Sequence, residues 1–114
     1  MELLGIGTDI VSIDRMRGVT NLERFCEYVL IKNEIEEMKD SRDKVQFIAS
    51  RFASKEALIK AWPGTINYHD IETGKDGEKF IMKVPQQNPK GYNILASISH
   101  SFTDSIAIAT VLKN

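Results

Sequence analysis

Asp9, Glu56 and Lys60 are residues whose types and spacing could act together on a phosphate group. Glu56 and Lys60 stand four positions apart in the segment RFASKEALIKA (51–61), so in a helix both side chains lie on one face. Asp9 stands in the mainly apolar segment GIGTDIV, where a charged carboxylate is costly unless it is compensated. Mg²⁺ in phosphate chemistry takes one or two carboxylates and completes its shell with water and phosphate oxygens. Asp9 and Glu56 are therefore of the type that could hold a divalent cation.

Each of these residues also has a structural interpretation. Asp9 could pair with an arginine or reach solvent at a strand end. Glu56 and Lys60 could form a surface ion pair, which stabilises a helix by about 0.3–0.5 kcal/mol. Arg51 and Lys55 lie on an adjacent, partly different face, and a solvated basic stripe explains them as well as a binding role does. Two carboxylates alone are weak evidence for a metal site, because they occur in any chain.

The elements that must position these residues can be read from hydrophobic spacing. Leu3 to Ile13 is apolar and β-branched, which predicts a strand. Apolar residues at helical spacing predict a long helix from Lys44 to Trp62, ended by Pro63-Gly64. Two shorter helices are expected before it, one from an Asn21 N-cap through Leu30 and one from Asn33 to Lys39.

The C-terminal half changes to strand periodicity. A β-hairpin is expected from Asp70–Thr73 and Phe80–Val84, with Asp76-Gly77 at its turn. A polar loop over 85–91 and two further strands, 94–99 and 106–112, follow. We therefore expect one α+β domain over residues 1–114, with a mostly antiparallel sheet packed against one long helix and shorter helices.

Three motifs in a fixed order resemble the short 4′-phosphopantetheinyl transferases. They are Gly-x-Asp at 7–9, Arg-Phe-x-x-Lys-Glu-Ala-x-x-Lys-Ala at 51–61, and Ser-x-Ser-His at 97–100. The helical motif is the most specific of the three, and the resemblance extends over nearly the whole chain. It implies the 4′-phosphopantetheinyl transferase fold.

The resemblance implies a reaction as well. A serine hydroxyl of apo acyl carrier protein attacks the β-phosphate of coenzyme A, 3′,5′-ADP leaves, and the holo protein serves fatty acid biosynthesis. Asp9 and Glu56 would bind Mg²⁺, and Lys60 would be catalytic and contact the phosphates. His100 and Arg51 would bind the coenzyme. Glu56 would accept the serine proton directly or through a metal-bound water, and the sequence leaves both routes open.

The resemblance also implies protein partners. Carrier proteins of this family are acidic, so a basic docking face is expected. Arg15 matches a docking position of the family, whereas Arg17 and Arg24 are added on charge alone and could equally be ordinary solvated arginines. Larger relatives carry two halves in one chain, and this chain holds only one, so a homotrimer with sites between chains is expected.

Composition bears on the possible partners and on the cellular location of the protein. Fifteen basic and 16 acidic residues give a net charge of −1, which argues neither for nor against a polyanionic partner. We expect no nucleic-acid partner. Cys26 is the one cysteine, expected as a small buried hydrophobe. No signal peptide or long apolar stretch indicates secretion or a membrane, so a cytoplasmic location is expected.

Some segments depart from the family pattern, and two other functions compete with the one that the resemblance implies. Residues 63–67 form a shorter, less glycine-rich loop, residues 85–93 lack a helix common in the family, and Ile31 stands where Thr commonly caps a helix. A non-catalytic module that binds coenzyme A or nucleotide would be expected to lack a metal carboxylate or Lys60. An unrelated Mg²⁺-dependent phosphohydrolase would usually need a third acid.

Overall fold

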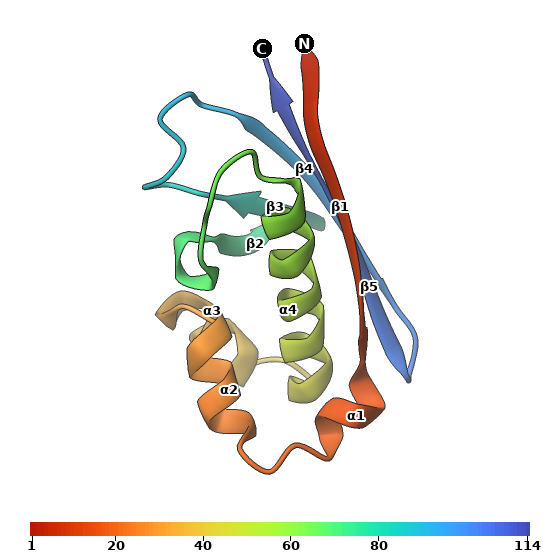
Figure 1. The fold of residues 1–114 in the computed structure, drawn as a ribbon. Coiled ribbons are helices and arrows are strands. Elements are labelled where there is room, and N and C mark those ends of the chain that lie inside the picture. The colour runs from red at the N-terminus through yellow and green to blue at the C-terminus, as the bar shows by residue number, and fades with distance from the viewer.

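The computed structural model describes all 114 residues. One long helix packs against a sheet, and shorter helices and a hairpin surround them (Figure 1). The elements in chain order are β1 (Glu2–Ser12), α1 (Ile13–Arg17), α2 (Leu22–Val29), α3 (Lys32–Lys39), α4 (Lys44–Ala61), the 3₁₀ helix η1 (Tyr68–Asp70), β2 (Glu72–Asp76), β3 (Lys79–Lys83), β4 (Asn93–His100) and β5 (Asp104–Lys113). All strand pairs are antiparallel, as expected. The predicted α+β class is confirmed.

The main sheet has the strand order β1-β5-β4. Its two outer strands are far apart in sequence, and the central strand β5 pairs with both. Strands β1 and β5 run side by side along their whole length, which places the two chain ends next to each other (Figure 1). Asp9 is opposite Ala107 in this pairing, near the end of β1 that leads into α1.

The hairpin β2–β3 forms a separate two-stranded sheet. The expected turn at Asp76-Gly77 is shifted by one residue, because Asp76 still pairs with Lys79 and the loop is Gly77-Glu78. Gly77 has a φ of +65°, which a residue without a Cβ adopts at little cost. The strand expected from Asp70 starts instead at Glu72, after η1.

Small residues let α4 pack closely on the sheet. Ala53, Ala57 and Ala61 are buried at intervals of four along α4, and Ala107 and Ala109 of β5 are buried opposite them. The helix starts at an N-cap, where the Asp43 carboxylate accepts a hydrogen bond from the Gln46 backbone N–H at 3.1 Å. It ends one residue earlier than expected, at Ala61.

A second hydrophobic cluster joins α1, α2 and α4. Its buried members are Ile13, Met16, Cys26, Val29, Leu30, Ile48 and Ala49. Cys26 is therefore a packing residue, as expected. Helix α1 was not predicted, and it ends the N-terminal strand at Ser12, whose hydroxyl accepts from the Arg15 N–H at 3.1 Å. A single helical turn offers too few residues for periodicity to reveal it.

The two faces of the main sheet differ in exposure. Helix α4 covers one face, and the other presents large hydrophobic side chains to solvent: Leu3, Ile6, Ile10, Leu95, Ile106 and Ile108. Ile6 and Ile10 are 60% and 66% exposed. None of the helices combines the length and hydrophobicity needed to cross a lipid bilayer.

Candidate active site

Two glycines of β1 bring Asp9 to helix α4. A Cβ built on Gly7 would lie 1.9 Å from the carbonyl oxygen of Ala57, and one on Gly5 would lie 2.0 Å from that of Ala61. The strand and the helix therefore touch backbone to backbone. Because side chains alternate along a strand, Asp9 projects from the same face as Gly7, toward α4.

Lys60 compensates the charge of Asp9. Its ammonium lies 3.2 Å from Asp9 Oδ1 and donates a 2.9 Å hydrogen bond to the carbonyl oxygen of Thr8. The Asp9 side chain is 20% exposed and that of Lys60 is 53% exposed, so the pair faces an accessible surface. Lys60 thus pairs with Asp9 across two elements, and the alternative of an ion pair with Glu56 within the helix is not realised.

Glu56 lies in the same groove as Asp9. The groove has a volume of about 580 Å³, and Asp9, Glu56 and Arg15 are its charged lining residues. The rest of its wall is mainly apolar and includes Met16, Val19, Phe25 and Phe52. An open groove with two carboxylates and one arginine can hold a cation together with an anionic ligand.

Tyr68, which sequence analysis did not single out, donates a hydrogen bond from its hydroxyl to Glu56 Oε1 at 2.5 Å. Burial raises the pKa of the Tyr68 phenol, and the hydrogen bond to Glu56 raises it further. The hydroxyl therefore keeps its proton at neutral pH and remains a donor. No motif marked this residue, because the contact depends on where η1 returns to α4.

The donor set of Asp9 and Glu56 suits Mg²⁺. Asp9 Oδ1 contacts Lys60 and Glu56 Oε1 accepts from Tyr68, while neither second carboxylate oxygen has a protein partner. Hard divalent cations prefer such oxygens. The chain has no cluster of three or more acidic, histidine or cysteine side chains that could enclose a metal by itself. Two carboxylates are what an ion needs when phosphate oxygens and water complete its coordination.

His100 and Arg51 meet in a second cavity of about 580 Å³. The His100 ring is exposed at the end of β4, and Gln46 Nε2 donates to its Nδ1 at 2.7 Å. The basic residues Arg42 and Lys75 and the acidic residues Asp43 and Glu78 also line this cavity. The predicted coenzyme contacts are therefore divided, with Lys60 beside the carboxylate groove and His100 and Arg51 at the second cavity.

Arg51 is nearly buried and mostly engaged by the protein. Its guanidinium donates to Glu37 of α3 at 3.1 Å and to Thr73 of β2 at 2.8 Å. It also lies over the Phe47 ring, 4.4 Å from the centroid. Only 4% of the residue is exposed, so Arg51 ties α4 to α3 and β2 as well as lining the cavity.

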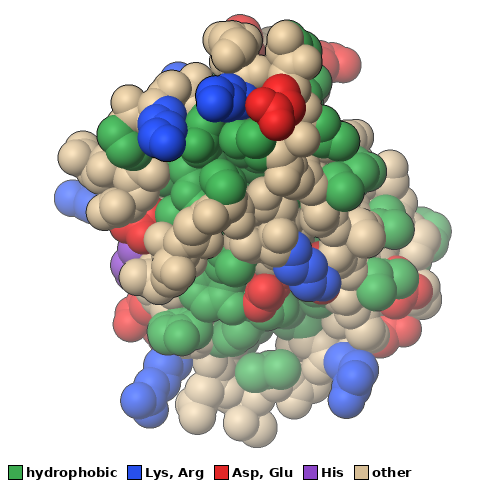
Figure 2. Space-filling model, turned by 45° about the horizontal axis from the view of Figure 1, so that its top comes forward, with side chains coloured by type: hydrophobic (Ala, Val, Ile, Leu, Met, Phe, Trp, Pro, Cys, Tyr) green, Lys and Arg blue, Asp and Glu red, His purple; other side chains and the backbone are tan.

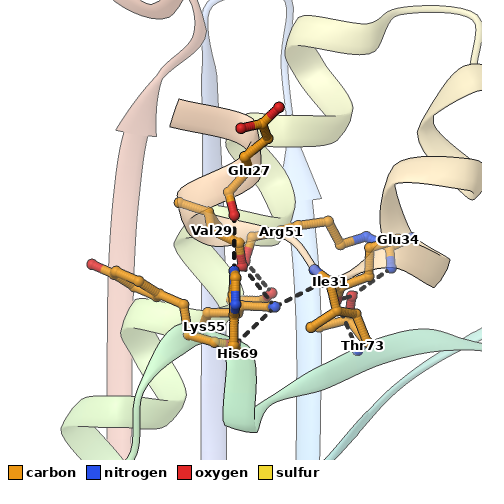
Figure 3. Close-up of polar contacts among 10 residues, drawn as sticks. Glu27, Val29, Ile31, Glu34, Arg51, Lys55, His69 and Thr73 are labelled. Carbon is orange, nitrogen blue, oxygen red and sulfur yellow. Dashed lines mark hydrogen bonds and ion pairs between the residues drawn. The ribbon is translucent and has the colours of Figure 1, made fainter. Parts of the chain in front are cut away.

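Lys55 is not a solvated base, and that interpretation is wrong. The residue is fully buried, and its ammonium contacts Glu34 at 2.7 Å, the Val29 carbonyl oxygen at 2.9 Å and the Tyr68 carbonyl oxygen at 3.0 Å (Figure 3). Burial lowers the pKa of Lys55, and the neighbouring Glu34 opposes that shift.

Glu34 serves several partners at once. Besides Lys55, its carboxylate accepts from the Ile31 backbone N–H at 2.8 Å and from the backbone N–H and hydroxyl of Thr73 (Figure 3). Its place three residues after Ile31, at the start of α3, is the sequence signal for the first of these bonds. The contact with Lys55 joins α3 to α4 and could not be read from local spacing.

The three predicted docking arginines lie around α1 and α2. Arg15 is exposed and lines the carboxylate groove, and Arg24 is exposed on α2. Arg17 forms a two-point contact with Asp43, at 2.5 and 3.2 Å. On the face shown in Figure 2, Lys and Arg side chains are dispersed among hydrophobic ones and form no single block. His69 is exposed, and its Nε2 lies 2.8 Å from the carbonyl oxygen of Glu27.

Comparisons with known proteins agree on one family. A profile of the 4′-phosphopantetheinyl transferase superfamily matches residues 5–111. The chain is similar to the holo-[acyl-carrier-protein] synthase of Oceanobacillus iheyensis, with 37% identity over 92% of each chain. It is also similar to that of Bacillus pumilus, with 38% identity over 95% of this chain and 93% of the relative.

Solved structures extend the similarity to three dimensions. The Bacillus anthracis holo-(acyl-carrier-protein) synthase in complex with CoA (3′,5′-ADP) matches with a TM-score of 0.85 and 30% identity over the whole of both chains. The Helicobacter pylori synthase in complex with coenzyme A matches with a TM-score of 0.80 and 32% identity, over 93% of this chain and 98% of that one.

Proposed function

The chain belongs to the 4′-phosphopantetheinyl transferase superfamily, and within it to the holo-acyl-carrier-protein synthases; from this premise we propose its reaction and the residues that perform it. The 4′-phosphopantetheine of coenzyme A is transferred to a serine of an apo acyl carrier protein, in support of fatty acid biosynthesis. The bond between the serine oxygen and the β-phosphorus forms, the bond to the leaving phosphate breaks, and 3′,5′-ADP is released.

The observation that carries this proposal is the meeting of Asp9 and Glu56 in one groove, with Lys60 held against Asp9. Asp9 and Glu56 would hold Mg²⁺, which when bound supplies positive charge to the pyrophosphate. Lys60 adds a second cation beside the same carboxylate. Its ammonium can shift from Asp9 to a phosphate oxygen that enters the groove. There it would stabilise the negative charge that develops on the leaving group.

Glu56 is the proposed acceptor of the serine proton. Its carboxylate lies in the groove, with Oε1 engaged by the Tyr68 hydroxyl. A carboxylate acts as a general base when it lies within hydrogen-bonding distance of the proton it removes. Phe25 and Phe52 form part of the apolar wall of the same groove.

We assign the nucleotide end of coenzyme A to the second cavity. His100 and Arg51 line it together with Arg42 and Lys75, the basic side chains that would contact a phosphate, and with the acidic Asp43 and Glu78. Arg51 contributes charge from a fixed position because Glu37 and Thr73 hold its guanidinium.

The proposed carrier-protein surface is formed by Arg15, Arg17 and Arg24. Arg15 fits this role best, because it lines the groove that contains the carboxylates and would bring an acidic partner to them. Arg17 contributes less, since Asp43 already neutralises much of its charge. The dependence of the carrier-protein KM on salt measures this electrostatic contribution.

A homotrimer is the proposed assembly, with sites between chains. The exposed hydrophobic face of the main sheet supports association, since apolar surface of this kind commonly marks an interface. Light scattering at assay concentration tests the trimer.

We place the protein in the cytoplasm, because its single cysteine is buried and not in a disulfide, which suits a reducing compartment.

The proposed reaction is tested by product release. The protein is incubated with coenzyme A, Mg²⁺ and an apo acyl carrier protein, and 3′,5′-ADP is measured by chromatography. Release should require the carrier protein and its active-site serine, and a chelator should stop it. If coenzyme A binds but no 3′,5′-ADP is released with several carrier proteins, the chain is a non-catalytic coenzyme A-binding module.

A further inference from the structure

Glu56 is restrained by a residue from outside α4. The Tyr68 hydroxyl donates to Glu56 Oε1 at 2.5 Å, and Tyr68 opens η1, the short helix that follows α4. The two residues are twelve positions apart, so this bond requires the chain to turn back along α4. No other side chain hydrogen-bonds to Glu56.

Tyr68 is itself fixed from several sides. Its carbonyl oxygen accepts from the ammonium of the fully buried Lys55 at 3.0 Å. Its ring packs against the Phe52 ring, with centroids 5.9 Å apart, and against the Tyr28 ring at 5.4 Å. Downstream, the Asp70 carboxylate accepts from the Asn67 backbone N–H at 2.8 Å and closes the turn.

Two contacts of Tyr68 therefore connect the buried Lys55–Glu34 ion pair to the groove that contains Glu56. Lys55 and Glu56 are neighbours in sequence and project from α4 in different directions, Lys55 into the interior and Glu56 toward the groove. The Lys55 ammonium holds the Tyr68 backbone, and the Tyr68 hydroxyl returns to Glu56 (Figure 3 shows the Lys55 contacts).

This arrangement has a chemical consequence. Glu56 is a partly buried side chain with three rotatable bonds, and a free carboxylate would sample several orientations. A strong donor on Oε1 selects one orientation and presents Oε2 to the groove. Hydrogen bonds from outside the coordination shell commonly orient metal-binding carboxylates in this way.

We propose that Tyr68 is a positioning residue, which orients the Glu56 carboxylate for the cation and is anchored by the buried Lys55–Glu34 pair. The proposal rests on the proposed function for the role of Glu56. Tyr68 does not touch the substrate in this account, and it acts only through Glu56.

The test removes one oxygen atom. Tyr68→Phe keeps the ring between Phe52 and Tyr28 and loses the hydroxyl. Tyr28→Phe is the matched control, because it removes a hydroxyl from the neighbouring ring, which is 66% exposed. Binding of Mn²⁺ in the presence of coenzyme A is measured by calorimetry and electron paramagnetic resonance, beside the melting temperature of each protein.

We expect Tyr68→Phe to weaken Mn²⁺ binding about 10- to 100-fold, the range found when the partners of metal ligands are lost. Tyr28→Phe should bind Mn²⁺ like the wild type. In the transfer assay Tyr68→Phe should raise the metal concentration needed for half-maximal rate and lower kcat, with the carrier-protein KM unchanged.

Two results would overturn the proposal. One is Mn²⁺ affinity in Tyr68→Phe equal to that of Tyr28→Phe, whatever happens to the melting temperature. The other is tighter Mn²⁺ binding, which would mean that the hydroxyl competes with the cation. Since these are binding measurements, they remain informative if the wild type transfers no phosphopantetheine, and that result would contradict the proposed function alone.

Discussion

The backbone of Gly7 lies directly against the carbonyl oxygen of Ala57, with no space for a side chain between β1 and α4. This contact sets the distance between the strand that carries Asp9 and the helix that carries Glu56 and Lys60. The glycine of the Gly-x-Asp motif thus has a packing role that explains why it precedes the aspartate by two residues.

Gly7→Ala should destabilise the protein and separate the two carboxylates. The added Cβ would lie 1.9 Å from a backbone oxygen, so the helix must move. Overpacking of this kind costs about 1–3 kcal/mol of the free energy of unfolding. Urea denaturation measures the loss. Gly74→Ala is the control, because nothing lies within 4 Å of a Cβ there, and its stability should change by less than about 1 kcal/mol.

Asp9→Asn should lower kcat/KM for transfer by about 100-fold or more, because it removes the charge that would bind the cation while keeping the side-chain shape. Asp14→Asn, at an exposed position in α1, should leave the rate within about twofold of wild type. Steady-state kinetics on folded proteins decide the matter. Near-wild-type turnover by Asp9→Asn at ordinary Mg²⁺ would exclude Asp9 from the site.

Secondary structure could be predicted from the sequence where a segment with regular apolar spacing was long. Helix α4 and the strands were located to within a few residues, because their apolar spacing reflects one buried face. The turn of the β2–β3 hairpin was placed one residue early, since the Asp-Gly pattern does not by itself fix strand register. Helix α1 was missed because five residues show no period.

For the candidate site, the sequence indicated residues within motifs but not the contacts that depend on tertiary packing. The order of the motifs predicts Asp9, Glu56 and Lys60 as site residues; in the structure Asp9 and Glu56 line one groove, and Lys60 contacts Asp9. The burial of Lys55 and Arg51 was not foreseen, because their partners Glu34 and Glu37 come from α3 and the pairing exists only once α3 packs on α4. Tyr68 was missed because its contact with Glu56 forms only where η1 returns to α4.

Lys55→Met should destabilise the protein by about 3–5 kcal/mol, because it leaves the Glu34 carboxylate buried without its ammonium partner. Replacing both residues, as in Lys55→Met with Glu34→Gln, should restore part of the loss. Lys39→Met provides the comparison. It breaks an exposed ion pair with Glu36 and should cost no more than about 1 kcal/mol. Equal losses for Lys55→Met and Lys39→Met, by chemical denaturation, would contradict the role given to the buried pair.

The Arg17–Asp43 contact should make stability depend on acid pH. The hydrogen bond from Arg17, and then that from the Gln46 N–H, holds the pKa of Asp43 below its usual range. Because this pKa is lower in the folded state than in the unfolded chain, where it is about 3.9, the ionised carboxylate stabilises the folded protein at pH values above about 3.9. This contribution is lost as the pH falls from about 5 through the folded pKa.

Asp43→Asn isolates this effect, because asparagine also caps a helix but does not titrate. The wild type should be the more stable protein at pH 6, and the difference should shrink as the pH falls toward 3. Thermal melts of both proteins across this range measure it. A difference that stays constant with pH would show that Asp43 contributes only as a cap.

The central claim is that Asp9, Glu56 and Lys60 form a site that transfers phosphopantetheine to a carrier protein. It is tested most directly by intact-mass spectrometry of an apo acyl carrier protein after incubation with this protein, coenzyme A and Mg²⁺. The carrier protein should gain the mass of one phosphopantetheine on its serine, and it should not do so with Glu56→Gln, without metal or with the serine replaced by alanine. An unmodified serine with the wild-type protein, or equal modification by Glu56→Gln, would contradict the claim.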